Sequence, residues 1–356
     1  MFIDDLQTPA LVLNLDILER NLQRMATECE QAQIALRPHT KTHKSPWIAA
    51  RQMKLGAVGV CAAKVGEAEV MVKSGIDNVL ITTELVPHVM NRVLSLASMA
   101  NIRVVADSTE MVVELGRRAV ARKQELSVLA DINVGQNRTG IEPGQPALEL
   151  VQTITKTKGL RFAGLQAYEG HCQHLFDYEK QRTAAFTAYQ RIAATKSLIE
   201  GFGIEVGTVT TAGTGTYRFA IEHGIATEVQ PGSYTVMDCV YSRVERTHYE
   251  NALWIVCSVI STNRSEGPVV DAGWKTVSID GGMPIVKDQP DARYTIAGDE
   301  HGKISGLHSP VRPGDHIWLV PSHCDTTINL YDRYILIRDD GHVEGTLDIA
   351  GRGKSA

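Results

Sequence analysis

The stretch 102-IRVVADSTEMVVELGRRAVARKQELSVLADI-132 contains two apolar, β-branched runs separated by one amphipathic segment. The runs 102–108 and 126–132 are typical of buried strands, and 109–123 has the length and periodicity of a helix. A strand, a helix and a second strand in this order form the repeating unit of a parallel sheet. We therefore expect the same unit elsewhere in the chain.

Similar runs recur at fairly regular intervals up to about residue 235. The eight predicted strands are 35-ALRPHTK-41, 57-AVGVCAA-63, 78-NVLITTE-84, 102-IRVVADS-108, 126-LSVLADI-132, 161-RFAGLQAY-168, 206-VGTVTTAG-213 and 226-ATEVQPGS-233. Helix-like segments lie between them, such as 45-SPWIAARQMKLG-56, in which Ser45 can cap the helix and Pro46 fits its first turn. Eight such units predict a (β/α)8 TIM barrel, because the alternative, a doubly wound open sheet, normally has fewer strands.

The pattern changes near residue 240, after which short strands and turns replace helical periodicity. The strands predicted there are 252-ALWIVCSVIS-261, 267-GPVVDAG-273, 316-HIWLVPS-322, 333-RYILIRD-339 and 342-HVEGTLDI-349. We expect an α/β fold in which residues 15–240 form the barrel and residues 1–14 plus 241–356 form an all-β domain. The early strand 10-ALVLN-14 is expected to pair with that domain.

The amino-acid composition limits the kinds of molecule that the protein is expected to bind. The chain has 356 residues, 43% of them hydrophobic and 22% charged, and a formal net charge of -5. This acidic balance, without a Lys/Arg block, argues against nucleic acid and against an anionic membrane surface. Six cysteines are scattered without framework spacing, and the segment 1-MFIDDLQTPA-10 has acids where a signal peptide has bases. We expect a cytoplasmic protein with a small-molecule partner.

Polar residues fall where a barrel of this kind places its chemistry, at the carboxyl ends of the strands. Lys41 ends the first strand, and Arg138 follows the fifth. Tyr168, His171 and His174 follow the sixth strand. The small-residue loops 211-TAGTGTY-217 and 230-QPGSYTVMD-238 come after strands seven and eight, the positions that often bind phosphate in barrels.

A phosphate site and a strand-end lysine together suggest a phosphorylated aldehyde cofactor held by Lys41 as a Schiff base. The alternative for Lys41 is an ordinary surface lysine, which is the expected role of nearby Lys44. The hydroxyl groups of Thr214 and Ser233 are available to the phosphate.

Five segments resemble one known family, the D-threonine aldolase and D-serine dehydratase family of pyridoxal-phosphate enzymes. They are 36-LRPHTKTHK-44, 131-DINVGQNRTG-140, 164-GLQAYEGHCQH-174, 230-QPGSYTVMD-238 and 319-LVPSHCDTTINLYD-332. The resemblance covers essentially the whole chain in order. It implies an alanine-racemase-like fold, pyridoxal 5'-phosphate as the cofactor, and a homodimer.

The resemblance also implies roles for individual residues. Lys41 holds the cofactor, Arg138 contacts its ring oxygen, and Tyr168 and Tyr234 line its pocket. The loops at Thr214, Gly215, Gly232 and Ser233 hold its phosphate. The expected cofactor-binding residues are thus Lys41, Arg138, Tyr168, Thr214, Gly215, Gly232, Ser233 and Tyr234.

His323 and Asp325 are two residues apart, so on an extended strand they would face the same side and could bind one cation. An isolated His-x-Asp more often indicates a polar loop, but the resemblance implies a divalent metal here. The aldolase branch of the family has His-x-Asp and the dehydratase branch has His-x-Cys. The carboxylate of Asp325 thus favours the aldolase branch, and favours Mn²⁺ or Mg²⁺ over Zn²⁺. Cys324 is expected to be packed.

We therefore expect a lyase that cleaves D-3-hydroxy amino acids of the D-threonine type to glycine and an aldehyde, with His174 as the base. The alternative is a D-serine or 3-hydroxy-D-aspartate dehydratase that gives a 2-oxo acid and ammonia. A non-catalytic cofactor-carrying protein is a third hypothesis, which the second domain and the metal pair disfavour. The roles of His39, His171, Glu169 and His301 stay open.

Overall fold

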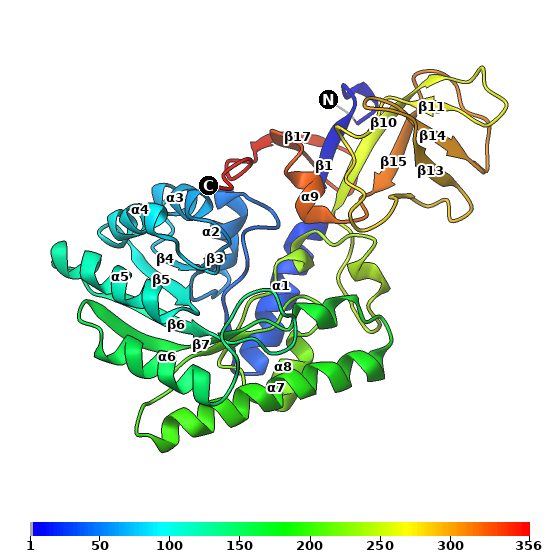
Figure 1. Cartoon of the computed structure of the whole chain (residues 1–356). Coiled ribbons are helices and arrows are strands. Elements are labelled where there is room, and N and C mark those ends of the chain that lie inside the picture. Colours follow the sequence, from blue (N-terminus) through cyan, green and yellow to red (C-terminus); the bar gives the residue numbers. More distant parts are fainter. Residues whose placement is uncertain (1–2) are drawn as a thin grey trace.

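Eight parallel strands surround the centre of the larger part of the molecule (Figure 1). The structure is a computed structural model, and it describes residues 3–356 apart from the side chains of Asp4 and His174. The strands are β2 (Ala35–Leu36), β3 (Val60–Ala62), β4 (Asn78–Ile81), β5 (Asn101–Ala106), β6 (Leu126–Asp131), β7 (Leu160–Ala167), β8 (Val209–Thr211) and β9 (Glu228–Val229). Their order is β2-β9-β8-β7-β6-β5-β4-β3. A parallel bridge between His39 and Cys61 joins the first strand segment to β3, so the sheet closes into the predicted barrel.

Helices cover the outside of this barrel. They are α1 (Leu15–Gln31), α2 (Pro46–Lys54), α3 (Val65–Lys73), α4 (Pro87–Ala97), α5 (Thr109–Ala121), α6 (Gln145–Lys156), α7 (Tyr178–Gly201) and α8 (Tyr217–His223). Local sequence explains where several of them begin. Ser45 caps α2 by accepting a hydrogen bond from the Ile48 N–H, with Pro46 in the first turn, and Ser108 caps α5 in the same way. Among the described residues, no helix combines the length and the apolar character that crossing a membrane requires.

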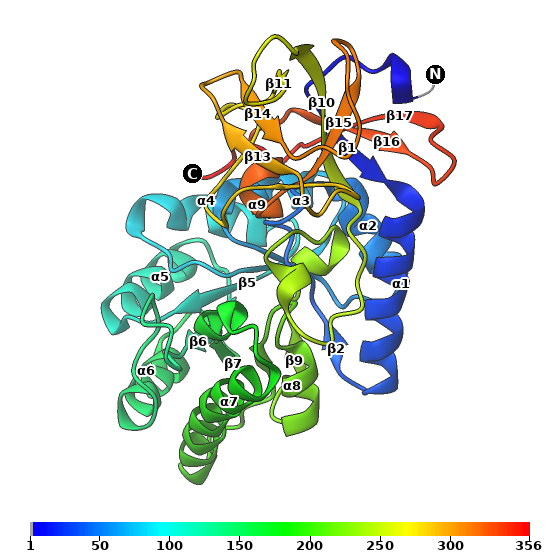
Figure 2. The ribbon, with the colours of Figure 1, turned by 90° about the vertical axis from the view of Figure 1, so that its right-hand side faces the viewer.

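A second sheet of nine strands forms the other part of the molecule (Figure 2). Its strands are β1 (Ala10–Asn14), β10 (Leu253–Ser261), β11 (Val269–Val270), β12 (Ile285–Val286), β13 (Arg293–Ile296), β14 (Gly302–Ser305), β15 (His316–Val320), β16 (Arg333–Ile337) and β17 (Val343–Asp348). β1 pairs antiparallel with β10 and parallel with β16. Because β1 lies in this sheet and α1 follows directly, we propose 1–14 plus 241–356 as the β domain and 15–240 as the barrel.

One prediction about the β domain is wrong. The segment after β15 is not extended at His323 and Asp325, because Cys324–Ile328 forms the short helix α9 and His323 stands at its N-cap position. Buried Asp238 provides the physical reason, since its carboxylate accepts a hydrogen bond of 2.8 Å from the Cys324 N–H in the first turn. The short strands β12, β13 and β14 were also not predicted, because four residues or fewer carry little periodicity.

The barrel and the β domain meet beside the first strand segment. The hydroxyl of buried Tyr334, on β16, donates a hydrogen bond of 2.7 Å to the backbone oxygen of His43. The Gly351 N–H donates to the backbone oxygen of Lys44 at 2.8 Å. These contacts hold α9 next to the end of the segment that carries Lys41.

Tyr334→Phe should lower the free energy of unfolding by about 1–2 kcal/mol, because the buried His43 carbonyl would lose its hydrogen bond. Chemical denaturation measures this directly. The control is Tyr178→Phe, since the Tyr178 hydroxyl makes no hydrogen bond to the described residues and its loss should be nearly neutral. Equal stability of the wild type and Tyr334→Phe would contradict the assignment.

Candidate active site

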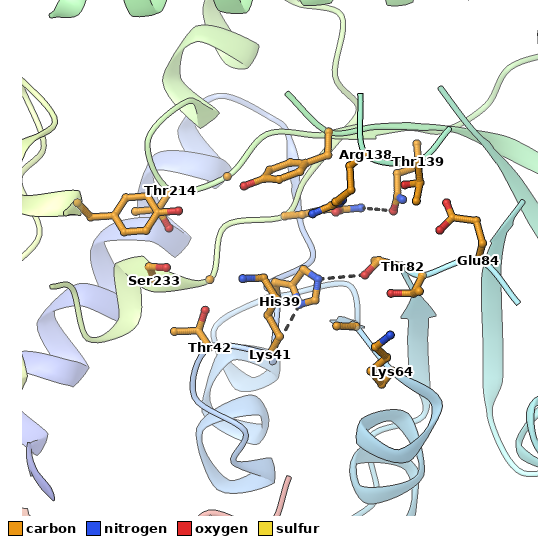
Figure 3. A pocket seen from close by; sticks show the side chains of 18 residues that line it. His39, Lys41, Thr42, Lys64, Thr82, Glu84, Arg138, Thr139, Thr214 and Ser233 are labelled. Atoms are coloured by element: carbon orange, nitrogen blue, oxygen red, sulfur yellow. Dashed lines mark hydrogen bonds between the residues drawn. The ribbon is translucent and has the colours of Figure 1, made fainter. Parts of the chain in front are cut away.

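A cavity of about 280 Å³ opens at the carboxyl ends of the barrel strands (Figure 3). Residues that follow every barrel strand except β5 contribute to its wall, together with Tyr241. They include His39, Lys41, Thr42, Lys64, Thr82, Glu84, Arg138, Thr139, Tyr168, Thr214 and Ser233. A more open groove of about 650 Å³ adjoins the cavity at Lys41 and Lys64 and reaches Asp325 and Asp280 of the β domain.

The loops after β8 and β9 form one side of the cavity, with Gly213, Thr214, Gly232 and Ser233 in its wall. The backbone N–H groups of Thr214, Gly232 and Ser233 have no hydrogen-bond partner among the described residues. A Cβ atom at Gly232 would lie 2.6 Å from Thr42 Oγ1, so the close approach of these two segments requires glycine. Free amide donors in a glycine-lined concavity suit the phosphate of the expected cofactor.

Two residues predicted for this region do not line the cavity. The Gly215 N–H donates instead to Gln173 Oε1 at 3.0 Å. Tyr234 is fully buried, and its hydroxyl accepts a hydrogen bond of 2.9 Å from Gln52 Nε2, because a buried phenol needs a polar partner. Gly213, which was not singled out, lines the cavity in their place.

Lys41 extends toward the β domain, where its ammonium donates a hydrogen bond to Asp325 Oδ2. Burial disfavours the charge on Lys41, but the charge of Asp325, its hydrogen bond to Lys41 and the neighbouring Tyr168 and Cys324 together outweigh this effect and raise the Lys41 pKa. Burial likewise disfavours the charge on Asp325, yet the Lys41 ammonium and the neighbouring His323 lower its pKa. The resulting ion pair joins the barrel to α9.

Asp325 also faces the second predicted metal ligand. His323 Nε2 lies 4.0 Å from Asp325 Oδ1. His323 Nδ1 is 2.6 Å from Asp280 Oδ2, and Asp280 is held in turn by the hydroxyls of Thr326 and Ser278. Within the described residues, no group of three or more His, Cys, Asp or Glu side chains is arranged as a metal centre. An imidazole and a carboxylate directed at one point, open to a groove, nevertheless fit a divalent cation that keeps other positions free.

Asp280 is a member of the site that sequence reasoning missed. It lies 43 positions from His323 in a turn-rich segment that has no recognisable motif. Cys324 behaves as expected, since its side chain is fully buried.

Arg138 and Tyr168 face the cavity from the loops after β6 and β7. The Arg138 guanidinium is 5.5 Å from the centre of the Tyr168 ring, and burial raises the pKa of Tyr168 to about 12. The structure therefore brings Lys41, Arg138, Tyr168, Thr214, Gly232 and Ser233 together around one cavity.

His39 also lines the cavity, and His39 Nε2 lies 3.0 Å from Thr82 Oγ1. Burial, and then the nearby Lys41 cation, lower the His39 pKa well below its usual range, so the ring is neutral. His171 and His301 are exposed and do not line this cavity. The side chain of His174, the predicted base, lies outside the described residues.

Glu84 lines the cavity, and a second carboxyl group, that of Asp131, lies next to it. Asp131, at the end of β6, is in hydrogen-bonding contact with Glu84 and accepts hydrogen bonds from Gln166 Nε2 and Thr139 Oγ1 at 3.1 and 3.2 Å. Burial, followed by the hydrogen bond and the charge of Glu84, raises the Asp131 pKa well above 3.8. The Asp131 carboxyl therefore keeps its proton to a higher pH in the folded protein than in the unfolded chain.

The raised pKa of Asp131 makes stability depend on pH. Above about pH 4 the unfolded chain releases the proton while the native state keeps it, so stability falls as pH rises, by at most ~1.4 kcal/mol per pH unit for one proton. In Glu84→Gln the new side-chain amide can donate a hydrogen bond to Asp131, so that the Asp131 carboxylate no longer needs a proton of its own. We expect the difference in unfolding free energy between Glu84→Gln and the wild type to grow in favour of the variant from pH 5 to pH 8, as measured by denaturation. The exposed control Glu110→Gln should show no such trend, and a constant difference for Glu84→Gln would refute the raised pKa of Asp131.

Comparisons with known proteins agree with this geometry. The sequence matches the family described as "Alanine racemase, N-terminal domain" over residues 13–239 and that described as "Putative serine dehydratase domain" over residues 252–337. It is 37% identical to a D-threonine aldolase from Arthrobacter sp over 355 residues, which cover 98% of this chain and 93% of that protein. It is 34% identical to a 3-hydroxy-D-aspartate aldolase from Paracoccus denitrificans (strain Pd 1222) over 361 residues, with the same coverage of 98% and 93%.

The solved structure of D-threonine aldolase from Filomicrobium marinum superimposes on this chain with a TM-score of 0.97 and 42% sequence identity. The match covers 99% of this chain and 97% of that one. The chain therefore belongs to the alanine-racemase-like family of D-threonine aldolases and D-serine dehydratases.

Proposed function

We propose that the chain is a lyase that cleaves D-3-hydroxy amino acids of the D-threonine type to glycine and an aldehyde, using pyridoxal 5'-phosphate and a divalent metal ion. The observation that carries this proposal is the position of Asp325, with one carboxylate oxygen on the Lys41 ammonium and the other facing His323. A single carboxylate, that of Asp325, thus lies between the Lys41 amine and His323, the other proposed metal ligand. A 3-hydroxy amino acid carries its amino and hydroxyl groups on adjacent carbons, so it can reach both at once.

Different residues of the cavity would bind different parts of the cofactor. The free N–H groups of Thr214, Gly232 and Ser233 would hold its phosphate, and Lys41 would hold its aldehyde carbon. Arg138 is proposed for the ring oxygen, and the Tyr168 ring would border the cofactor ring. When bound, the cofactor supplies an electron sink for the pair of electrons released at Cα.

His323 and Asp325 would hold the metal ion, which supplies a Lewis acid for the substrate hydroxyl group. Hard carboxylate ligation favours Mn²⁺ or Mg²⁺ over Zn²⁺. Asp280 fixes the His323 ring by accepting from Nδ1, which leaves Nε2 directed toward Asp325. His174 remains our proposal for the base that removes the hydroxyl proton.

We also propose a cytoplasmic homodimer. All six cysteines are unpaired, which suits a reducing compartment. Trp274, whose residue surface is 51% exposed, lies in the wall of the groove beside Asp280, and a second subunit could cover it. We propose neither nucleic acid nor a membrane surface as a partner.

The products distinguish the proposed reaction from its alternative. Incubation with D-threonine, pyridoxal 5'-phosphate and Mn²⁺ should give glycine and acetaldehyde in equal amounts. A dehydratase would give a 2-oxo acid and ammonia from D-threonine or D-serine. Chromatography of the amino acid and a coupled assay for each carbonyl product decide between the two, with Lys41→Ala as the inactive control. A 2-oxo acid as the main product would reject the aldolase.

Asp280→Asn should weaken metal affinity by about 10–100-fold, because the hydrogen bond that orients a metal-binding histidine is altered. Titration of the metal-free protein with Mn²⁺ measures this affinity. Cofactor binding should not change, since Asp280 lies in the groove and not in the wall of the cavity. A control at Asp291, an exposed carboxylate near His308, should leave metal affinity unaltered when changed to Asn. Unchanged affinity in Asp280→Asn would remove Asp280 from the metal site.

A further inference from the structure

Glu169 is a buried carboxylate that the reaction described above does not use. It follows β7 directly after Tyr168, its side chain is inaccessible to solvent, and it does not line the cavity. It forms no ion pair with any described residue. A buried charge without a cation is costly unless hydrogen bonds satisfy it fully.

Hydrogen bonds do satisfy it, and most of them come from one loop. Glu169 Oε1 accepts from the hydroxyls of Thr216 at 2.5 Å and Tyr189 at 3.1 Å. Glu169 Oε2 accepts from the Ala212 N–H at 3.3 Å, and it lies 2.8 Å from the Thr211 hydroxyl, whose one proton it shares with the Ala167 carbonyl oxygen. Three of these four donors belong to residues 211–216, the loop that brings Gly213 and Thr214 to the cavity.

The conformation of this loop is not one that its sequence would adopt by itself. Ala212 has a φ of +68°, which is unfavourable for a residue that carries a Cβ atom. The Thr216 hydroxyl accepts from the Gly213 N–H at 3.1 Å while it donates to Glu169. Glu169 therefore binds both ends of the turn, and the Gly213 N–H is directed into the loop instead of into the cavity.

A carboxylate is the side chain that suits these neighbours. Both of its oxygens are acceptors, whereas the amide nitrogen of glutamine can only donate. In Glu169→Gln that nitrogen would face either two hydroxyl donors or a hydroxyl and the Ala212 N–H. At least one hydrogen bond to the loop would be lost.

We propose that Glu169 is a positioning residue that holds loop 211–216 in the conformation that binds the phosphate of the cofactor. It acts through the hydroxyls of Thr211 and Thr216 and touches neither cofactor nor substrate. The inference rests on the proposed function, because it requires that pyridoxal 5'-phosphate binds in this cavity.

The test compares two ligands that differ in the phosphate alone. The full-length protein is freed of cofactor, and its dissociation constants for pyridoxal 5'-phosphate and for pyridoxal are measured by absorbance titration. In the wild type the phosphorylated ligand should bind more tightly. Glu169→Gln should weaken the binding of pyridoxal 5'-phosphate by about 10–100-fold, which is the effect of losing a hydrogen bond to a charged group. It should change the dissociation constant of pyridoxal by less than about threefold.

Two threonine variants control for general destabilisation. Thr216→Val removes the link between Glu169 and the loop, so it should lower the preference for the phosphorylated ligand in the same direction as Glu169→Gln. Thr195→Val is the matched control, because the buried Thr195 hydroxyl also accepts a glycine N–H, that of Gly144 at 3.0 Å, but in another loop. It should keep the wild-type ratio of the two dissociation constants.

Each outcome has a separate meaning. A wild-type ratio in both Glu169→Gln and Thr216→Val overturns the inference, and so does an equal loss for both ligands, which indicates a purely structural role. If Glu169→Gln does not fold, the comparison of Thr216→Val with Thr195→Val decides alone. Failure of the wild type to prefer the phosphorylated ligand would overturn the proposed function itself.

Discussion

The ion pair between Lys41 and Asp325 connects two parts of the chain that are 284 positions apart. Lys41 comes from the end of the first barrel segment, and Asp325 comes from the first turn of α9 in the β domain. Other contacts hold each partner of this ion pair in place. Tyr334 and Gly351 fasten the β domain to His43 and Lys44, and Asp238 fixes the first turn of α9. The site exists because these contacts bring one carboxylate to one amine, and neither domain contains it alone.

This arrangement explains why the chemistry is located at the boundary of the two domains. The barrel contributes a cavity of about 280 Å³ with free amide donors at one side and an arginine and a tyrosine at another. The β domain contributes Asp325 and Asp280 to the adjoining groove, and His323 lies between these two carboxylates. A ligand that occupies both spaces must present an anion to the loops and polar groups on neighbouring atoms to Lys41 and Asp325. These requirements describe a phosphorylated cofactor joined to an amino acid with a hydroxyl group at its third carbon.

Local sequence patterns were sufficient to predict the barrel. All eight of its strands lie within or beside the predicted runs, and Lys41, Arg138, Tyr168, Thr214, Gly232 and Ser233 all face the cavity. The rule that parallel strands present their carboxyl ends at one edge accounts for this success. The predictions failed where long-range contacts decide the outcome. Gln173 and Gln52 direct Gly215 and Tyr234 away from the cavity, and the Asp238 carboxylate favours a helix at Cys324 where the spacing of His323 and Asp325 suggested a strand. Asp280 and Glu169 act through partners far away in sequence, so no local pattern identifies their roles.

The most direct test of this account is to find which lysine carries the cofactor. The protein is saturated with pyridoxal 5'-phosphate, reduced with borohydride, digested, and mapped by mass spectrometry. We expect the mass of one reduced cofactor on the peptide that contains Lys41, with Lys44 and Lys64 unmodified. A label on either of those neighbours, or no stable label in the saturated protein, would contradict the proposal that the Lys41 amine is the centre of the site.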